Sequence, residues 1–172
     1  FKRMAEQQKT LNDLTSNDDL WERMKVSYWV CLIFIPMPVI AAFFLGEPLI
    51  LVLIVTAVLA VIGVCAHHFG QAFAPHIIGM VMVGHVVTLT SVFAGHPWQM
   101  DMHMLFFVVL AVVSTQNNVG AIITTAAVIA VHHLSFALMM PALVYPGSDL
   151  TQYMGRTALH AGIVILETGV LV

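Results

Sequence analysis

The feature that most constrains this chain is a series of apolar segments, most of them close to the length that crosses a lipid bilayer. A helix rises 1.5 Å per residue, so about 20 apolar residues span a hydrocarbon core of about 30 Å. Of the 172 residues, 60% are hydrophobic and only 9% are charged, against roughly 25% charged in soluble domains. We therefore predict an all-α, polytopic membrane protein with six transmembrane helices, at about 27–45, 48–67, 73–94, 102–116, 119–140 and 155–172.

The N-terminal segment 1–26 is the one strongly polar part of the chain, and it holds five of the six Lys and Arg residues. Leu20, Trp21 and Met24 would form an apolar stripe on a short helix, which predicts an amphipathic segment at the membrane surface. Because basic residues favour the cytoplasmic side, we expect a cytoplasmic N-terminus, followed by a six-helix domain over 27–172.

The sixth segment is still apolar at Val172 and would return to the cytoplasmic side. We therefore expect the helix to continue on the cytoplasmic side, which suits a receptor with a cytosolic signalling domain in the same chain and would also suit a truncated transporter. The chain has no basic stripe for a nucleic acid, so the lipid bilayer is its expected surrounding. No general base stands at a recognisable spacing from a set of ligands, and an enzymatic activity of the membrane domain itself is not expected.

Nine histidines in or beside apolar segments are the chemical anomaly of the sequence. Ionisable residues inside a membrane are costly and mark functional sites. The helical rise places several of them in the outer half of the bilayer. A transition-metal site is predicted there from His96, Asp101, His103, His132, His133 and His160.

Two further residues are candidate cofactor-binding or supporting groups, namely His85 and Glu167. Glu167 follows His160 by two helical turns and so shares its face. Imidazole and carboxylate suit copper, iron or zinc, and the sequence does not distinguish these metals. Since adjacent residues on a helix point about 100° apart, one residue of the His132–His133 pair should face the site while the other bonds a carbonyl or touches a second site.

Two other functions stay open at the level of the sequence. A haem sensor or electron-transfer protein would use two histidines as axial ligands of haem b, although Arg156 is the only basic residue outside the N-terminal segment to meet the propionates. A proton or ion transporter would use a polar path from His76 through His85 to the outer histidines.

Three linked segments resemble a known group of membrane domains: GHPWQMDMHMLFFVVLAVVS, AVIAVHHLSFALMMPALVYPGSDL and RTALHAGIVILE. Together they cover residues 95–167 and resemble the multi-helix sensor regions that precede bacterial methyl-accepting chemotaxis or diguanylate cyclase domains. That group often has an Asp-Arg pair after the fourth helix, where this chain has Gln116, Asn117 and Asn118. The resemblance implies a sensory input domain that signals to a cytosolic output domain, and it implies a homodimer.

Overall fold

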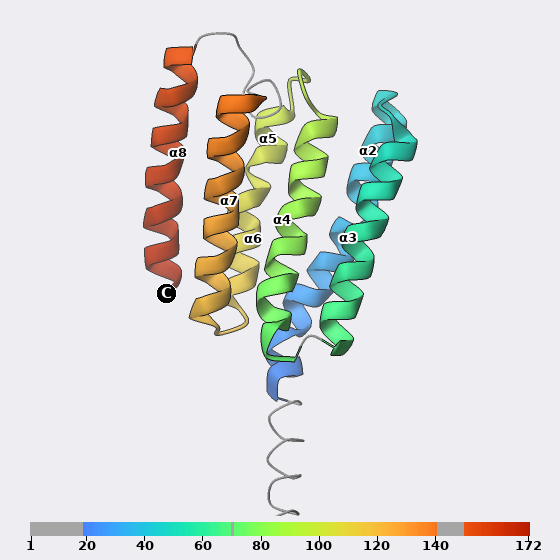
Figure 1. Ribbon diagram of the computed structural model, residues 1–172, viewed down its shortest axis with the longest axis vertical. Coiled ribbons are helices and arrows are strands. Elements are labelled where there is room, and N and C mark those ends of the chain that lie inside the picture. The colour runs from blue at the N-terminus through green and yellow to red at the C-terminus, as the bar shows by residue number, and fades with distance from the viewer. Residues whose placement is uncertain (1–18, 70, 141–149) are drawn as a thin grey trace, which may run out of the picture.

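The chain forms a bundle of antiparallel helices, seen in a computed structural model that describes residues 19–69, 71–140 and 150–172 (Figure 1). A helix that starts within the described part at Asp19 leads into α2. The remaining elements follow in order: α2 (Pro36–Leu45), α3 (Leu49–Phe69), the short 3-10 turn η1 (Gln71–Phe73), α4 (Ala74–Val92), α5 (Gln99–His103), α6 (Leu105–Ser114), α7 (Val119–Met139) and α8 (Leu150–Leu171). No strand occurs among these residues.

The described residues make six helical passes, and four of these are long and apolar enough to span a membrane: Asp19–Leu45, Leu49–His68, Ala74–Val92 and Val119–Met139. The segment predicted at 102–116 is a shorter apolar helix, Gln99–Ser114. The last predicted segment corresponds to α8, which begins at Leu150, five residues before the predicted start. The structure thus supports a polytopic membrane protein, with four of the six predicted spans identified as such.

The first pass begins in the region that the sequence assigned to a separate surface helix. Residues 19–34 form one helix with no break at residue 26, and Met24 is buried. A turn at Ile35 interrupts the helix before Pro36 and Pro38, as the prolines predict, because proline cannot donate a backbone hydrogen bond.

Helix α4 is the central element of the bundle. In its most apolar 18-residue stretch, 61% of the residues are buried, whereas the same share is 22–33% in the other three candidate spans. Close approach to its neighbours depends on glycine: a Cβ at Gly79 would lie 2.2 Å from Thr125 Oγ1 on α7, and one at Gly84 would lie 2.8 Å from Leu59 on α3. Small residues of this kind let membrane helices pack closely when water provides no driving force.

Four threonine hydroxyls on the spans are satisfied by the backbone of their own helix. Thr56, Thr88, Thr90 and Thr125 each donate to the carbonyl four residues earlier, at 2.7–2.8 Å. An unsatisfied hydroxyl in hydrocarbon would be costly, and this local bond removes the cost without a partner helix. These threonines are therefore compatible with a membrane interior.

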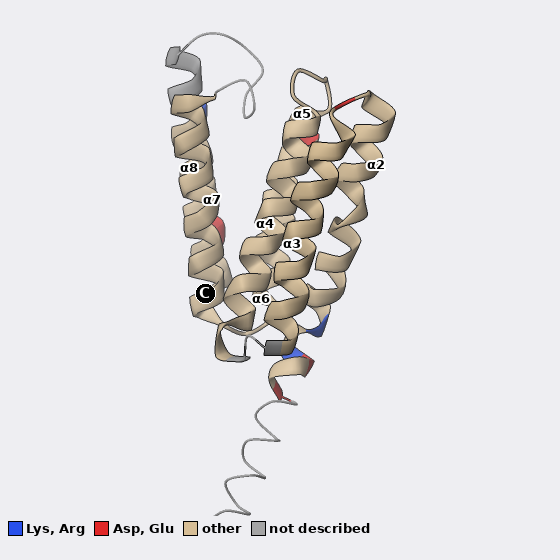
Figure 2. Ribbon diagram, turned by 45° about the vertical axis from the view of Figure 1, so that its right-hand side comes forward, with Lys and Arg blue, Asp and Glu red and all other residues tan. Residues whose placement is uncertain are grey.

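The start of the first described helix and the end of the last lie at one end of the bundle, and two turns between helices lie at the other. The start of the first helix and the end of α8 lie at the same end in Figure 1, as an even number of passes requires. In Figure 2 the ribbon positions of charged residues lie mostly near the ends of the bundle, and most of its length is uncharged. The turn after α2, closed by Gly46 in the left-handed conformation (φ 73°), and the 93–98 turn after α4 lie at the opposite end from Asp19.

Candidate metal centre

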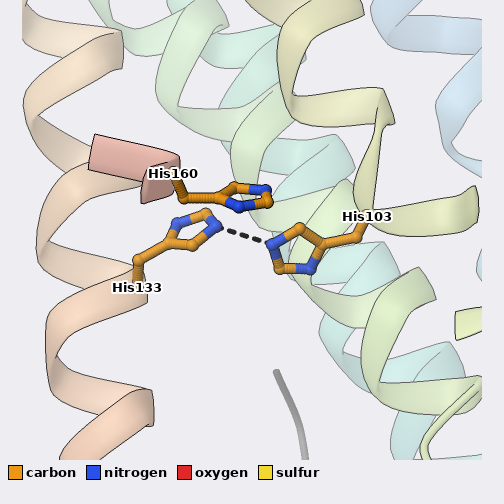
Figure 3. A group of neighbouring side chains, drawn as sticks. All are labelled: His103, His133 and His160. Atoms are coloured by element: carbon orange, nitrogen blue, oxygen red, sulfur yellow. Dashed lines mark hydrogen bonds between the residues drawn. The ribbon is translucent and has the colours of Figure 1, made fainter. Parts of the chain in front are cut away.

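Three histidines from three separate elements meet near the end of the bundle that holds the 93–98 turn. His103 ends α5, His133 lies on α7 and His160 on α8. One ring nitrogen of each lies within 4.8 Å of the others, and Figure 3 shows the three rings facing one another. His103 Nε2 and His133 Nε2 are 2.6 Å apart. This group could hold a metal ion, and it is the one such cluster of His, Cys, Asp or Glu in the described part of the chain.

The orientation of His133 is fixed by its own helix. Its Nδ1 lies 2.8 Å from the Ile129 carbonyl oxygen, four residues earlier. Since a carbonyl only accepts, Nδ1 carries the proton, and the neutral ring leaves the Nε2 lone pair toward the cluster. The bond to Nε2 is therefore donated by His103. A ligand histidine in a metal site typically has this arrangement, with the outer nitrogen bonded to a carbonyl.

The cluster is shielded from solvent. His103 is 1% exposed and His133 is 6% exposed, while His160 is half-buried. Phe106, one turn after His103, places its ring edge-on to His103 at 5.1 Å and to His133 at 5.2 Å between centroids. His160 stacks on His133 with an interplanar angle of 24°. Phe106 thus covers one side of a cluster whose candidate ligand atoms are all imidazole nitrogens.

His103 reaches this position because of a tightened turn between α5 and α6. The Met104 N–H contacts both the Met100 and the Asp101 carbonyls, and the Phe107 N–H donates to the Met104 carbonyl at 3.1 Å. Bonds of this i→i+3 type wind the helix more tightly than the α-helical pattern. Gln99 anchors the start of α5, since its buried side-chain Oε1 accepts a bond of 3.0 Å from the Gly95 N–H.

Two residues predicted as ligands lie outside the group. His96 is in the turn before α5, where its Nδ1 accepts a 3.1 Å bond from the Trp98 N–H. Asp101 is exposed. Two positions along a helix turn the side chain by about 200°, so Asp101 and His103 point to nearly opposite sides of α5. The single site predicted from both is therefore not what the structure assembles.

The pair His132–His133 divides as the helical geometry requires. His133 faces the cluster, while His132 is buried beside Phe136, with ring centroids 4.5 Å apart. His132 Nε2 is buried and has no hydrogen-bond partner among the described residues. His132 thus borders the cluster without belonging to it.

The two predicted supporting residues are also outside the group. His85 is 1% exposed on α4, and neither of its ring nitrogens has a hydrogen-bond partner within the described ranges. It lies against Phe34, Met37 and Leu105. Glu167 is partly buried on α8, and its Oε2 likewise has no partner in the part of the chain that the structure describes.

Phe106 and the Ile129 carbonyl are parts of the site that sequence reasoning missed. A signal for both existed, since Phe106 follows His103 by three residues and Ile129 precedes His133 by four, which places each on the same helical face as its histidine. Comparison of the chain with protein-family models, with curated proteins and with solved structures finds no match in any of the three.

Proposed function

We propose that this chain is a membrane-embedded sensory domain that binds a transition-metal ion through His103, His133 and His160. The observation that carries the proposal is the convergence of three ring nitrogens within 4.8 Å, from three elements far apart in sequence. Buried histidines normally satisfy their nitrogens with local carbonyls or water. Here two of them instead direct their Nε2 atoms at each other.

The donor set favours copper or zinc over iron. All three ligands are imidazoles, and no carboxylate or thiolate belongs to the group in the described residues. Non-haem iron sites typically combine two histidines with a carboxylate, whereas three histidines with one open position are typical of zinc, and imidazole also suits copper. Metal binding would leave the fourth position for water or a small exogenous ligand.

The rings need only a small rearrangement to bind an ion. Tetrahedral bonds of about 2.05 Å place ligand nitrogens about 3.3 Å apart. The widest separation of 4.8 Å must therefore shrink, and the 2.6 Å contact between His103 and His133 must open. His133 already presents a lone pair, whereas His103 must move its proton from Nε2 to Nδ1. The distance between each pair of ligand nitrogens would change by about 1.5 Å or less.

Signalling would follow from the place of α8 in the bundle. This helix packs mainly against α6 and α7, at the edge of the fold in Figure 1, and it supplies one of the three ligands. Drawing His160 toward His103 and His133 would shift α8 relative to the other helices. A ligand that binds one arrangement more tightly moves the population toward it. The similarity of residues 95–167 to bacterial sensor regions supports this function in a homodimer of the inner membrane, with a cytosolic output domain.

The two other functions considered from the sequence have less support. A macrocycle needs free space between its axial ligands, yet His103 and His133 are in hydrogen-bond contact and Phe106 lies against both rings. A transport path through His85 would need polar neighbours, but the residues around it are apolar: Phe34, Met37, Val86, Leu89 and Leu105.

The experiment is metal analysis of purified protein after loading with Cu(I), Cu(II) or Zn(II) and removal of excess ion. We expect one ion per chain, and loss of most of it in His103→Ala, His133→Ala and His160→Ala. His132→Ala is the matched control, because it removes an equally buried histidine next to His133 that lies outside the group. It should keep its metal.

Equal metal content in the three ligand variants and in the wild type would reject the site. Loss in His132→Ala with retention in His133→Ala would mean that α7 is rotated by about 100° from the arrangement seen here. Gel filtration in detergent shows whether each variant remains monodisperse, and His160→Gln, which keeps a polar side chain, replaces His160→Ala if that protein aggregates.

A further inference from the structure

A groove of about 530 Å³ opens between α2, α4 and the start of α5, at the end of the bundle where the 93–98 turn lies. Its walls are almost entirely apolar or aromatic, and they include Met37, Phe44, Leu89, Phe93 and Met102. The volume is in the range of about 300–1,000 Å³ that is typical of small-molecule sites. The groove shares no residue with the three-histidine cluster, so an inference from it is independent of the metal.

One polar ring with a defined proton position lines this groove. His96 accepts the Trp98 N–H at its Nδ1, so the neutral ring carries its proton on Nε2 and offers one hydrogen-bond donor. The ring is held edge-on between Phe93 and Trp98, with centroid distances of 5.3 and 5.6 Å. Trp98, which also lines the groove, adds an indole N–H donor.

The residue types that line the groove indicate which class of molecule it would bind. None of the lining residues is Lys or Arg, and a phosphate head group is ordinarily bound by such cations. Two neutral N–H donors match carbonyl oxygens, and aromatic walls match a flat ring. The exposed apolar side chains of Ile40 and Phe44 on α2 provide a surface for a hydrocarbon tail.

We propose that this groove binds a lipid-soluble quinone, with one ring carbonyl accepting a hydrogen bond from His96 Nε2 and the isoprenoid tail lying along α2. The quinone ring would lie beside Trp98 and Phe93, near the end of the spans. No chemical step is part of the proposal, which concerns binding alone.

Trp98 provides the measurement, because quinones quench indole fluorescence. Trp21→Phe/Trp29→Phe leaves Trp98 as the reporter, and Trp29→Phe/Trp98→Phe leaves Trp21, which lies at the opposite end of the bundle, as the matched control. Both proteins are placed in phosphatidylcholine nanodiscs and titrated with a decyl-substituted benzoquinone. We expect saturable quenching of Trp98 and only the linear quenching of bilayer partitioning for Trp21.

Substitution of His96 tests the role assigned to the donor. His96→Leu in the Trp98 reporter should weaken binding about three- to tenfold, the range expected for one lost hydrogen bond. Decylbenzene, which has the tail but no carbonyl, should compete poorly. If His96→Leu is not monodisperse, Ala41→Phe, which fills the groove from α2 without adding an indole, should abolish saturation instead.

Three outcomes would overturn the proposal. Equal, linear quenching of Trp98 and Trp21 would show partitioning into the bilayer only. Equal competition by decylbenzene would identify the groove as a contact for lipid tails. Unchanged affinity in a folded His96→Leu protein, or in the Ala41→Phe protein, would place the quinone elsewhere.

Discussion

Substitution of Gly79 by alanine should destabilise the bundle at the contact between α4 and α7. The new Cβ would lie 2.2 Å from Thr125 Oγ1, whereas its next neighbours, Thr125 Cβ and Val113 Cγ2, are at an ordinary 3.4 Å. The overlap with a single oxygen is therefore the whole conflict. Overpacking of this kind costs about 1–3 kcal/mol, and we expect Gly79→Ala to lower the free energy of unfolding by that amount.

The same geometry predicts a rescue. Thr125→Ala removes the clashing oxygen, and that hydroxyl bonds only to the Ala121 carbonyl of its own helix in the described contacts. Its loss alone should cost less than about 1 kcal/mol, since the carbonyl keeps its helical partner. The free energy of unfolding of Gly79→Ala/Thr125→Ala should then be about 1–2 kcal/mol higher than the value expected if the two single effects simply added.

The assay is reversible unfolding in mixed detergent micelles, followed by helical circular dichroism and analysed as a double-mutant cycle. Gly162→Ala on α8 is the control, because no atom lies within 4 Å of its added Cβ, and it should be neutral or slightly stabilising. An additive cycle, or a Gly79→Ala protein as stable as the wild type, would refute the close approach of α4 to α7 described here.

Three further predictions follow from other parts of the structure. Asn118 caps α7 by accepting the Ala121 N–H at 3.0 Å, so Asn118→Ala should lower unfolding free energy by about 1 kcal/mol while Asn118→Asp does not; equal losses in both would contradict a capping role. Reporter fusions should place both ends of the chain in the cytoplasm, and opposite sides would exclude an even number of crossings. Metal bound at the three histidines should be released by acid and retained at neutral pH, because a ligand imidazole must be unprotonated; equal retention at both would argue against histidine ligation.

Much of the helical layout could be predicted because span length and apolarity are local properties of the sequence. The predicted segments 73–94 and 119–140 match α4 and α7 closely, and the second is bounded by the Asn118 cap. The fourth segment was predicted to start too late, since α5 begins at Gln99 within a polar stretch that resembles a loop. The start of α8 at Leu150 is earlier than the predicted residue 155 for a similar reason, because turn-forming residues precede it.

The helical rise predicts which histidines lie at a similar depth, but it does not predict which of them face one another. Helical rise orders residues along the bilayer normal, and of the six ligands predicted in this way the structure brings His103, His133 and His160 together. Rotation of each helix about its axis decides which residues face inward, and helices that are apolar on every side carry little signal for that rotation. Asp101 lies outside the group for this reason, whereas His96 lies outside it because it is in the turn before α5.

The segment Gln99–Ser114 is hydrogen-bonded to other helices near both of its ends. His103 bonds His133 near one end, and the Val112 carbonyl accepts from Ser27 Oγ at 3.1 Å near the other. Both contacts are made by one continuous stretch of chain, near its opposite ends. A ligand that separates His103 from His133 would therefore pull on a segment whose other end is hydrogen-bonded to Ser27 of the first helix.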